Sequence, residues 1–237
     1  MKIQAIPSPM LGENAYIAHA ADTNEALIID PGYGTAERIK DYLKQNQLTA
    51  VNVLLTHGHP DHVWDCAAFN APVWIPGPDS YRLQNPMAHL PFPLELGGQS
   101  WNRPADIREL PTQTITLAAG IPVLMVPAPG HSEGSAIFLT EVSADEELQL
   151  DVPGLPPVHP AQGQAQPLAW CGDVIFAGSV GRTDLPGGDE TQMRHTLRTL
   201  ANAIDPATWL LPGHGPATTW DIEKRTNPYV IRARELG

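Results

Sequence analysis

The stretch VNVLLTHGHPDH, residues 51–62, places three histidines and an aspartate within six positions directly after an apolar run. The run Val51–Leu55 predicts a buried strand. Turns usually contain Gly, Asn, Asp or Pro, so three histidines indicate more than a change of chain direction. A loop at the exit of a strand can direct imidazoles and a carboxylate to one point, where they bind a metal ion. The candidate ligands here are His57, His59, Asp61 and His62.

Three later apolar runs are each followed by a glycine and then by a candidate ligand: Val123–Val126 before His131, Leu168–Cys171 before Asp173, and Thr208–Leu211 before His214. Each glycine allows a sharp turn at a strand end, so that the next side chain can face a shared cleft. Seven ligands are too many for one tetrahedral zinc, but two metals sharing one carboxylate would use all of them. Imidazole and carboxylate ligands suit zinc, iron or manganese, and a metal pair makes hydrolysis the default chemistry.

The rest of the chain predicts one mixed α/β domain over residues 1–237, with sheets covered by helices. Apolar residues at helical spacing predict helices over Thr35–Asn46 and Asp189–Ile204, the second with Asp189 as its N-cap. Residues 76–111 are Pro-rich but carry enough apolar side chains to pack against the body. Residues from about 143 to 166 are rich in Pro, Gly and Gln, which is typical of a surface loop inserted between two strands.

Composition argues against several classes of partner. The formal net charge is -12, from 14 Lys plus Arg and 26 Asp plus Glu, and no basic stripe is available to bind nucleic acid. No apolar run approaches the ~18 residues that a membrane-spanning helix needs. The first residues lack the apolar segment of a secretory signal, and the only cysteines are Cys66 and Cys171, which we expect to be buried thiols. We therefore expect a cytoplasmic protein without disulfides.

The run His57-x-His59-x-Asp61-His62, followed by His131, Asp173 and His214, resembles the ligand pattern of the metallo-β-lactamase superfamily. The resemblance implies an αββα sandwich of mixed sheets covered by helices. It assigns His57, His59 and His131 to one metal and Asp61, His62 and His214 to the other, with Asp173 as the bridge. It also implies two divalent metal ions per chain, zinc in the first place, with iron or manganese as alternatives.

Beyond the ligands, Ser179–Asp189 (SVGRTDLPGGD) and Asn227-Pro228-Tyr229 resemble single-domain glyoxalase II-like hydrolases. These hydroxyacylglutathione hydrolases cleave S-lactoylglutathione to lactate and glutathione in methylglyoxal detoxification. The resemblance implies that a bridging hydroxide between the metals attacks the thioester carbonyl, with Asp61 and Asp173 as catalytic residues. A thiol has a pKa of roughly 8.5, so the thiolate can leave without a dedicated proton donor. The candidate substrate-binding residues are Arg182, Tyr33, Lys224 and Arg225.

Two other functions compete with this interpretation. The Gly-Arg-Thr-Asp element at 181–184 also occurs in persulfide dioxygenases of the superfamily, which would hold one Fe(II) through His57, His131 and Asp173. A non-catalytic scaffold that binds metal and recognises a partner is the third possibility. The commonest β-lactamases fit less well, because they have a cysteine in the place of Asp173. Outside the ligand set, Asp30 follows a predicted strand and is expected to support the metal loop.

Overall fold

The structure is a computed structural model, and it describes residues 1–91, 100–112, 114–117, 120–144, 146–152 and 164–235. Its strands form two sheets. The seven-stranded sheet has the order β10-β1-β2-β3-β4-β5-β6 and the other the order β13-β12-β11-β9-β8-β7. The first comprises β1 (Lys2–Pro7), β2 (Asn14–His19), β3 (Glu25–Ile29), β4 (Thr49–Leu54), β5 (Val73–Ile75), β6 (Ile107–Glu109) and β10 (Gln149–Asp151). The second comprises β7 (Ile115–Leu117), β8 (Ile121–Pro127), β9 (Ala136–Val142), β11 (Gln166–Gly172), β12 (Trp209–Pro212) and β13 (Thr218–Thr219).

The α-helices of the described residues are α1 (Ala36–Gln45), α2 (Pro60–Val63), α3 (Glu190–Ala203), α4 (Trp220–Thr226) and α5 (Pro228–Glu235). Three short 3-10 helices are η1 (Cys66–Phe69), η2 (Gly77–Gln84) and η3 (Pro86–His89). Both helices expected from the apolar spacing are confirmed, as α1 and α3. The predicted cap is confirmed as well, because the Asp189 carboxylate accepts a hydrogen bond from the Gln192 backbone N–H at 2.8 Å.

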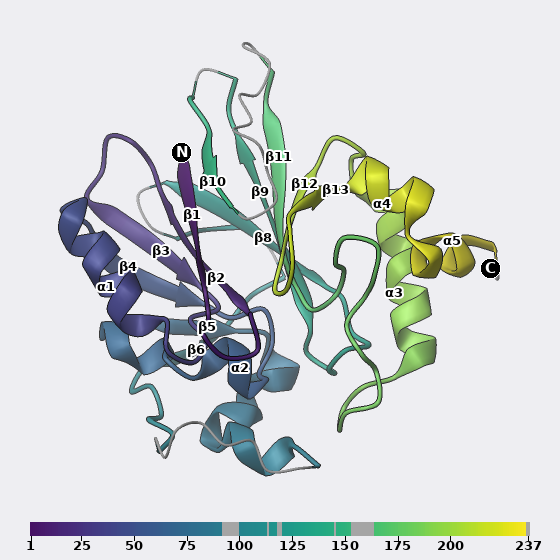
Figure 1. Cartoon of the computed structure of the whole chain (residues 1–237), viewed down its shortest axis with the longest axis horizontal. Coiled ribbons are helices and arrows are strands. Elements are labelled where there is room, and N and C mark those ends of the chain that lie inside the picture. The colour runs from purple at the N-terminus through teal and green to yellow at the C-terminus, as the bar shows by residue number, and fades with distance from the viewer. Residues whose placement is uncertain (92–99, 113, 118–119, 145, 153–163, 236–237) are drawn as a thin grey trace.

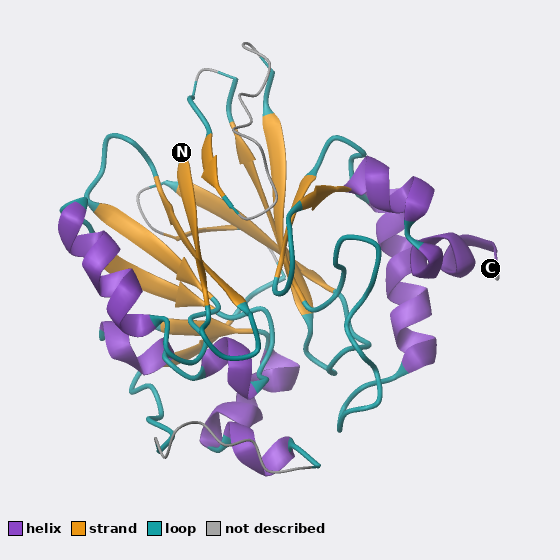
Figure 2. Cartoon of the chain, in the orientation of Figure 1, coloured by secondary structure: helices purple, strands orange, loops and turns teal. Residues whose placement is uncertain are grey.

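The two sheets stack face to face with helices on their outer sides (Figure 2). Leu54 of the first sheet and Phe138 of the second are both fully buried and lie in one hydrophobic cluster, which fills the space between the sheets. On the outer face of the first sheet, Ile39 of α1 packs into a second cluster. On the outer face of the second sheet, Leu197 of α3 belongs to a third. This layering confirms the expected αββα sandwich, with α1 flanking one sheet and α3 to α5 the other (Figure 1).

The direction of the strands brings their following loops to one edge. Strands β3, β4 and β5 are mutually parallel neighbours, so their carboxyl ends share an edge. In the other sheet β11 and β12 are also parallel, and the Gly213 N–H donates to the Gly172 carbonyl oxygen at 2.8 Å just beyond them. The Ala136 N–H donates to the Thr56 carbonyl oxygen at 3.1 Å and ties the two sheets together. Loops from both sheets therefore meet at this edge.

The two Pro-rich segments contain more regular structure than their composition indicates. Within 143–166, Gln149–Asp151 form β10 and pair in parallel with β1, so this part is an edge strand of the first sheet. Residue 145 and residues 153–163, which include His159, lie outside the described residues. Within 76–111, Leu83 of η2 is fully buried, as expected for a packed segment, and 92–99 are outside the described residues. No helix in the described part of the chain is both long and apolar enough to cross a bilayer.

Candidate metal centre

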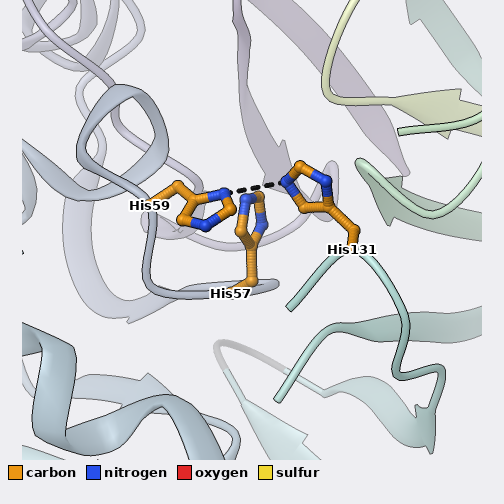
Figure 3. A group of neighbouring side chains, drawn as sticks. All are labelled: His57, His59 and His131. Atoms are coloured by element: carbon orange, nitrogen blue, oxygen red, sulfur yellow. Dashed lines mark hydrogen bonds between the residues drawn. The ribbon is translucent and has the colours of Figure 1, made fainter. Parts of the chain in front are cut away.

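Three histidines from two loops form the first group of candidate ligands. His57 and His59 follow β4, and His131 follows β8. One ring nitrogen of each of the three lies within 4.8 Å of a ring nitrogen of the other two. Figure 3 shows the three imidazole rings turned toward one another, with His59 Nδ1 and His131 Nε2 only 2.8 Å apart. All three residues are buried. The arrangement is that of three nitrogen ligands around a common point.

A second group comprises Asp61, His62 and His214, whose ligand atoms also lie within 4.8 Å of one another. Asp61 and His62 occupy the first turn of α2, which Pro60 opens, and His214 follows β12. His214 Nε2 lies 3.3 Å from Asp61 Oδ2. Two groups, each with three possible ligands, therefore share one edge of the sandwich.

Asp173, which follows β11, lies between the two groups. Its Oδ1 is 3.1 Å from His62 Nε2, and its Oδ2 is 3.5 Å from His131 Nε2 and 3.6 Å from His214 Nε2. Asp173 thus adjoins a histidine of the first group and two of the second. The structure brings together all seven candidate ligands that were predicted from the sequence.

Several buried polar atoms of this cluster lack a well-aligned hydrogen-bond partner: Nε2 of His57, His59 and His62, and Oδ1 of Asp173, the last two of which lie 3.1 Å from each other. Buried polar atoms are rarely left without partners, so each one needs a physical explanation. Divalent metal ions would satisfy these lone pairs, and the nitrogen and oxygen donor set fits zinc, iron and manganese alike. The cluster supports two metal ions without deciding their identity.

Electrostatics differ between the two groups. Burial lowers the pKa of His57 well below that of a free histidine, and it lowers the pKa of His59 to about 3. Burial alone would act likewise on His62, but Asp173 and Asp61 outweigh it and raise the pKa of His62 well above its usual value. Burial would raise the pKa of Asp173, yet His62 outweighs it and holds that pKa below its usual range. Without metal, His57 and His59 are therefore neutral, whereas His62 forms an ion pair with Asp173.

Hydrogen bonds from neighbouring residues fix the rings of the ligands. Asp30, buried after β3, accepts from the Thr56 N–H at 2.7 Å, the Thr56 hydroxyl at 2.6 Å and His62 Nδ1 at 3.0 Å. Because the Thr56 hydroxyl donates to Asp30, its oxygen can accept from His57 Nδ1 at 3.1 Å. His131 Nδ1 donates to the Arg182 carbonyl oxygen at 2.7 Å. These bonds place a proton on Nδ1 of His57, His62 and His131, so that Nε2 of each ring is the atom available to a metal; for His59, the nitrogen that faces His131 Nε2 is Nδ1.

Asp79 and Arg82 of η2 are functional candidates that the sequence analysis missed. The Asp79 side chain is fully buried, and it accepts hydrogen bonds from backbone N–H groups on both sides of the first group, at Gly58 and Gly134. Arg82 is buried beside it. The sequence offers one signal, that these two charged residues lie in the apolar segment 76–111. No motif near them in the sequence links them to residues 57–62.

Glu13 is a third residue that sequence reasoning missed. Its side chain is fully buried, both carboxylate oxygens lack hydrogen-bond partners, and burial raises its pKa well above the usual value. Its backbone pairs with that of His214. The side chain crowds Gly32, where an added Cβ would lie 2.2 Å from Glu13 Oε2 and 2.0 Å from the Asp61 carbonyl oxygen. Gly32 and Glu13 are therefore tightly packed against the loop 57–62.

A cavity of about 310 Å³ opens onto the two groups. Five of the candidate ligands line it: His59, Asp61, His131, Asp173 and His214. The other lining residues are Leu11, Pro60, Leu90, Phe176, Gly181, Arg182 and Leu185. Apart from the candidate ligands, the described side chains that line the cavity are therefore apolar, with the exception of the Arg182 guanidinium.

The four candidate substrate-binding residues do not all lie at this cavity. Arg182 lines it, with its guanidinium in a two-bond ion pair to Asp184 at 2.6 and 2.8 Å. Of the described residues that line the cavity, none is Tyr33, Lys224 or Arg225. Arg225 instead pairs with Asp221 within α4 at 2.5 Å. An amphipathic helix exposes such charges whether or not a ligand is near, so the sequence could not tell the two cases apart.

Comparison with known proteins agrees with this architecture. The model of the metallo-beta-lactamase superfamily matches residues 9–143. The hydroxyacylglutathione hydrolase GloC of Haemophilus influenzae is 30% identical over 97% of this chain and 98% of its own. Two crystal structures are also 30% identical: BLEG-1 B3 metallo-beta-lactamase (TM-score 0.74, covering 96% of this chain and 99% of that one) and TTHA1623 in a di-iron-bound form (TM-score 0.69, 95% and 98%). With two three-residue ligand groups at the edge of an αββα sandwich, the chain belongs to the metallo-beta-lactamase superfamily.

Proposed function

We propose that this metallo-hydrolase cleaves hydroxyacyl-glutathione thioesters, such as S-lactoylglutathione, with two metal ions. The observation that carries the proposal is the chemistry of the cavity wall. Among the described residues that line it, every titratable side chain other than Arg182 is a candidate metal ligand. Because a thiol has a pKa of roughly 8.5, the thiolate can leave without being protonated, whereas an amide nitrogen needs a proton donor. A site without a separate acid suits a thioester.

We assign the seven ligands to the two ions as the resemblance implies. His57, His59 and His131 would hold one ion and Asp61, His62 and His214 the other, with Asp173 between them. When bound, the ions supply a water molecule that is deprotonated near neutral pH and polarise the carbonyl oxygen of the substrate.

The protein groups position the reactants. Asp61 lines the cavity and would accept a hydrogen bond from the attacking water, which orients its lone pair toward the carbonyl carbon. Leu11, Phe176 and Leu185 would exclude solvent from the thioester. Arg182 would bind a glutathione carboxylate, sharing its guanidinium with Asp184. Tyr33, Lys224 and Arg225 would make only contacts remote from the reacting bond.

The relative GloC supports this substrate class, because it is a hydroxyacylglutathione hydrolase and is 30% identical across nearly the whole chain. The likeness to BLEG-1, also at 30% identity, favours β-lactam hydrolysis as a second candidate. Cys66 and Cys171 are buried free thiols, and a glutathione-dependent reaction belongs to the same reducing compartment, so we place the activity in the cytoplasm.

The test combines metal analysis with three assays on the purified protein. Thioester cleavage of S-lactoylglutathione with two metals per chain is the expected result. Oxygen uptake on glutathione persulfide with one iron per chain would assign the protein to the persulfide dioxygenases and overturn the proposal. Hydrolysis of a chromogenic β-lactam without thioester cleavage would overturn it in favour of a β-lactamase. Metal binding without turnover of any of the three would favour a non-catalytic scaffold.

A further inference from the structure

One carboxylate outside the ligand set connects the two loops of the first metal group. Asp79 Oδ2 accepts from the Gly58 N–H at 2.7 Å and from the Ser132 hydroxyl at 2.8 Å. Its Oδ1 accepts from the Gly134 N–H at 2.8 Å. Gly58 lies between His57 and His59, and Ser132 directly follows His131. A single fully buried side chain therefore holds both ligand-bearing loops.

The fit of η2 against these loops leaves no free space. A Cβ added to Gly58 would lie 2.7 Å from Arg82 Cδ, and one added to Gly134 would lie 2.6 Å from Asp79 Oδ1. Both distances are shorter than side chains tolerate, so the two backbones approach Asp79 and Arg82 as closely as glycine permits. The loops cannot move toward η2, and the hydrogen bonds to Asp79 prevent them from moving away.

Arg82 extends this connection to a third loop. Its Nη2 donates to the Glu133 carboxylate and, at 2.9 Å, to the Pro186 carbonyl oxygen. Its Nε lies 3.4 Å from Asp79 Oδ1, so the two buried charges compensate each other. Pro186 belongs to the loop after Arg182, whose carbonyl oxygen orients His131. The Asp79–Arg82 pair thus contacts every loop that places a ligand of the first group.

We propose that Asp79 is a positioning residue, which sets the metal affinity of the His57–His59–His131 group by fixing the separation of its two loops. Ligand atoms must converge within a few tenths of an ångström of ideal distances, so a loop that can drift binds its ion more weakly. Asp79 touches none of the second group, where Asp30 supports His62 instead. The inference rests on the metal assignment of the proposed function and is independent of the thioester chemistry.

The test measures two metal affinities in the Asp79→Asn variant. Asparagine keeps the shape of aspartate but turns an amide NH2 toward donors that previously met a carboxylate oxygen. We expect the affinity of the first group to fall 10- to 100-fold, as is usual when a group supporting a ligand is lost, and that of the second to stay unchanged. Titration of the metal-free protein with Co²⁺ against a competing chelator gives both constants. The His131→Ala and His214→Ala variants assign each constant to its group.

Glu223→Gln provides the matched control. Glu223 is also a buried carboxylate with three donors, from the Gly178 N–H at 2.9 Å, the Thr218 hydroxyl at 2.7 Å and Asn227 Nδ2 at 2.9 Å. None of its partners is a candidate ligand, so the variant should lose thermal stability while both Co²⁺ constants stay at their wild-type values.

Three outcomes distinguish the alternatives. Wild-type first-group affinity in Asp79→Asn, or an equal loss in Glu223→Gln, would overturn the inference, because the effect would then be absent or merely one of stability. A wild-type protein that binds fewer than two ions would overturn the proposed function instead. If Asp79→Asn does not fold, Ser132→Ala removes one of its three donors. That variant should weaken the first group several-fold, and unchanged affinity there would equally refute the positioning role.

Discussion

Replacing Asp30 with asparagine should weaken the second metal group through His62, and it should also disturb the first, because Asp30 Oδ2 accepts from the Thr56 hydroxyl that meets His57 Nδ1. Asp30 has a left-handed backbone with φ of 46°, which asparagine adopts as readily as aspartate, so the substitution adds no backbone strain. One amide oxygen can still accept from the Thr56 N–H. The NH2 that replaces Oδ2 would face the Nδ1–H of His62, now 3.0 Å from that oxygen. His62 must then move its proton to Nε2, the atom that would bind the metal, or tilt its ring.

The expected magnitude for the second group follows from the lost orientation of His62. Loss of a group that orients a metal ligand costs 10- to 100-fold in metal affinity, which is about 1.4–2.7 kcal/mol. A charge-assisted hydrogen bond contributes about 1.5–3 kcal/mol, so the two estimates agree. The assay is the Co²⁺ titration against a chelator, with Asp106→Asn, an exposed aspartate paired to Arg108, as the charge-matched control. Equal affinities for both ions in Asp30→Asn and wild type would refute the argument.

Three further predictions concern the centre and the core. Asp173→Ala removes the residue between the two groups, so both metal retention and turnover should be lost; near-normal activity would contradict the assignment. Because Asp173 and Asp61 raise the pKa of His62, metal binding to the second group must displace a proton there, so its affinity should increase from pH 6 to 8. In the first group, His57 and His59, whose pKa values burial lowers, should add nothing to such a slope, and proton release measured by calorimetry would decide. Phe138→Ala, at a fully buried position between the sheets, should lower the free energy of unfolding by about 3–5 kcal/mol in urea denaturation, and a loss below about 1 kcal/mol would contradict the packing.

Features encoded by neighbouring residues were predictable. The loop 57–62 carries four ligands within six positions, so its chemistry is visible without knowing what lies opposite. Helix α3 was equally predictable, because its apolar spacing and its Asp189 cap are local signals. The short strand β10 was not, since three residues of the sequence Gln-Leu-Asp acquire strand structure only by pairing with β1.

Residues that act through distant partners could not be assigned in the same way. Asp30 was expected to support the metal loop because it follows a strand, and it does contact His62, 32 positions away. Asp79 follows a comparable strand, β5, but nothing in its neighbourhood distinguishes it from a surface aspartate. Lys224 and Arg225 looked as suitable for a substrate as Arg182 did. Which charge faces a cavity depends on how whole elements pack.

The candidate ligand types, their number and the mixed α/β class could be predicted from the chain, because they depend on residue identity and on periodicities of two or 3.6 residues. Which atoms meet depends on how the two sheets pack. His62 and Asp173 lie 3.1 Å apart across 111 positions, and Asp79 bridges two loops separated by more than 70. Those distances are set by the register of the parallel strands and by the close contacts between loops that glycine permits. Both arise when the sheets pack together, and no periodic pattern in the sequence predicts them.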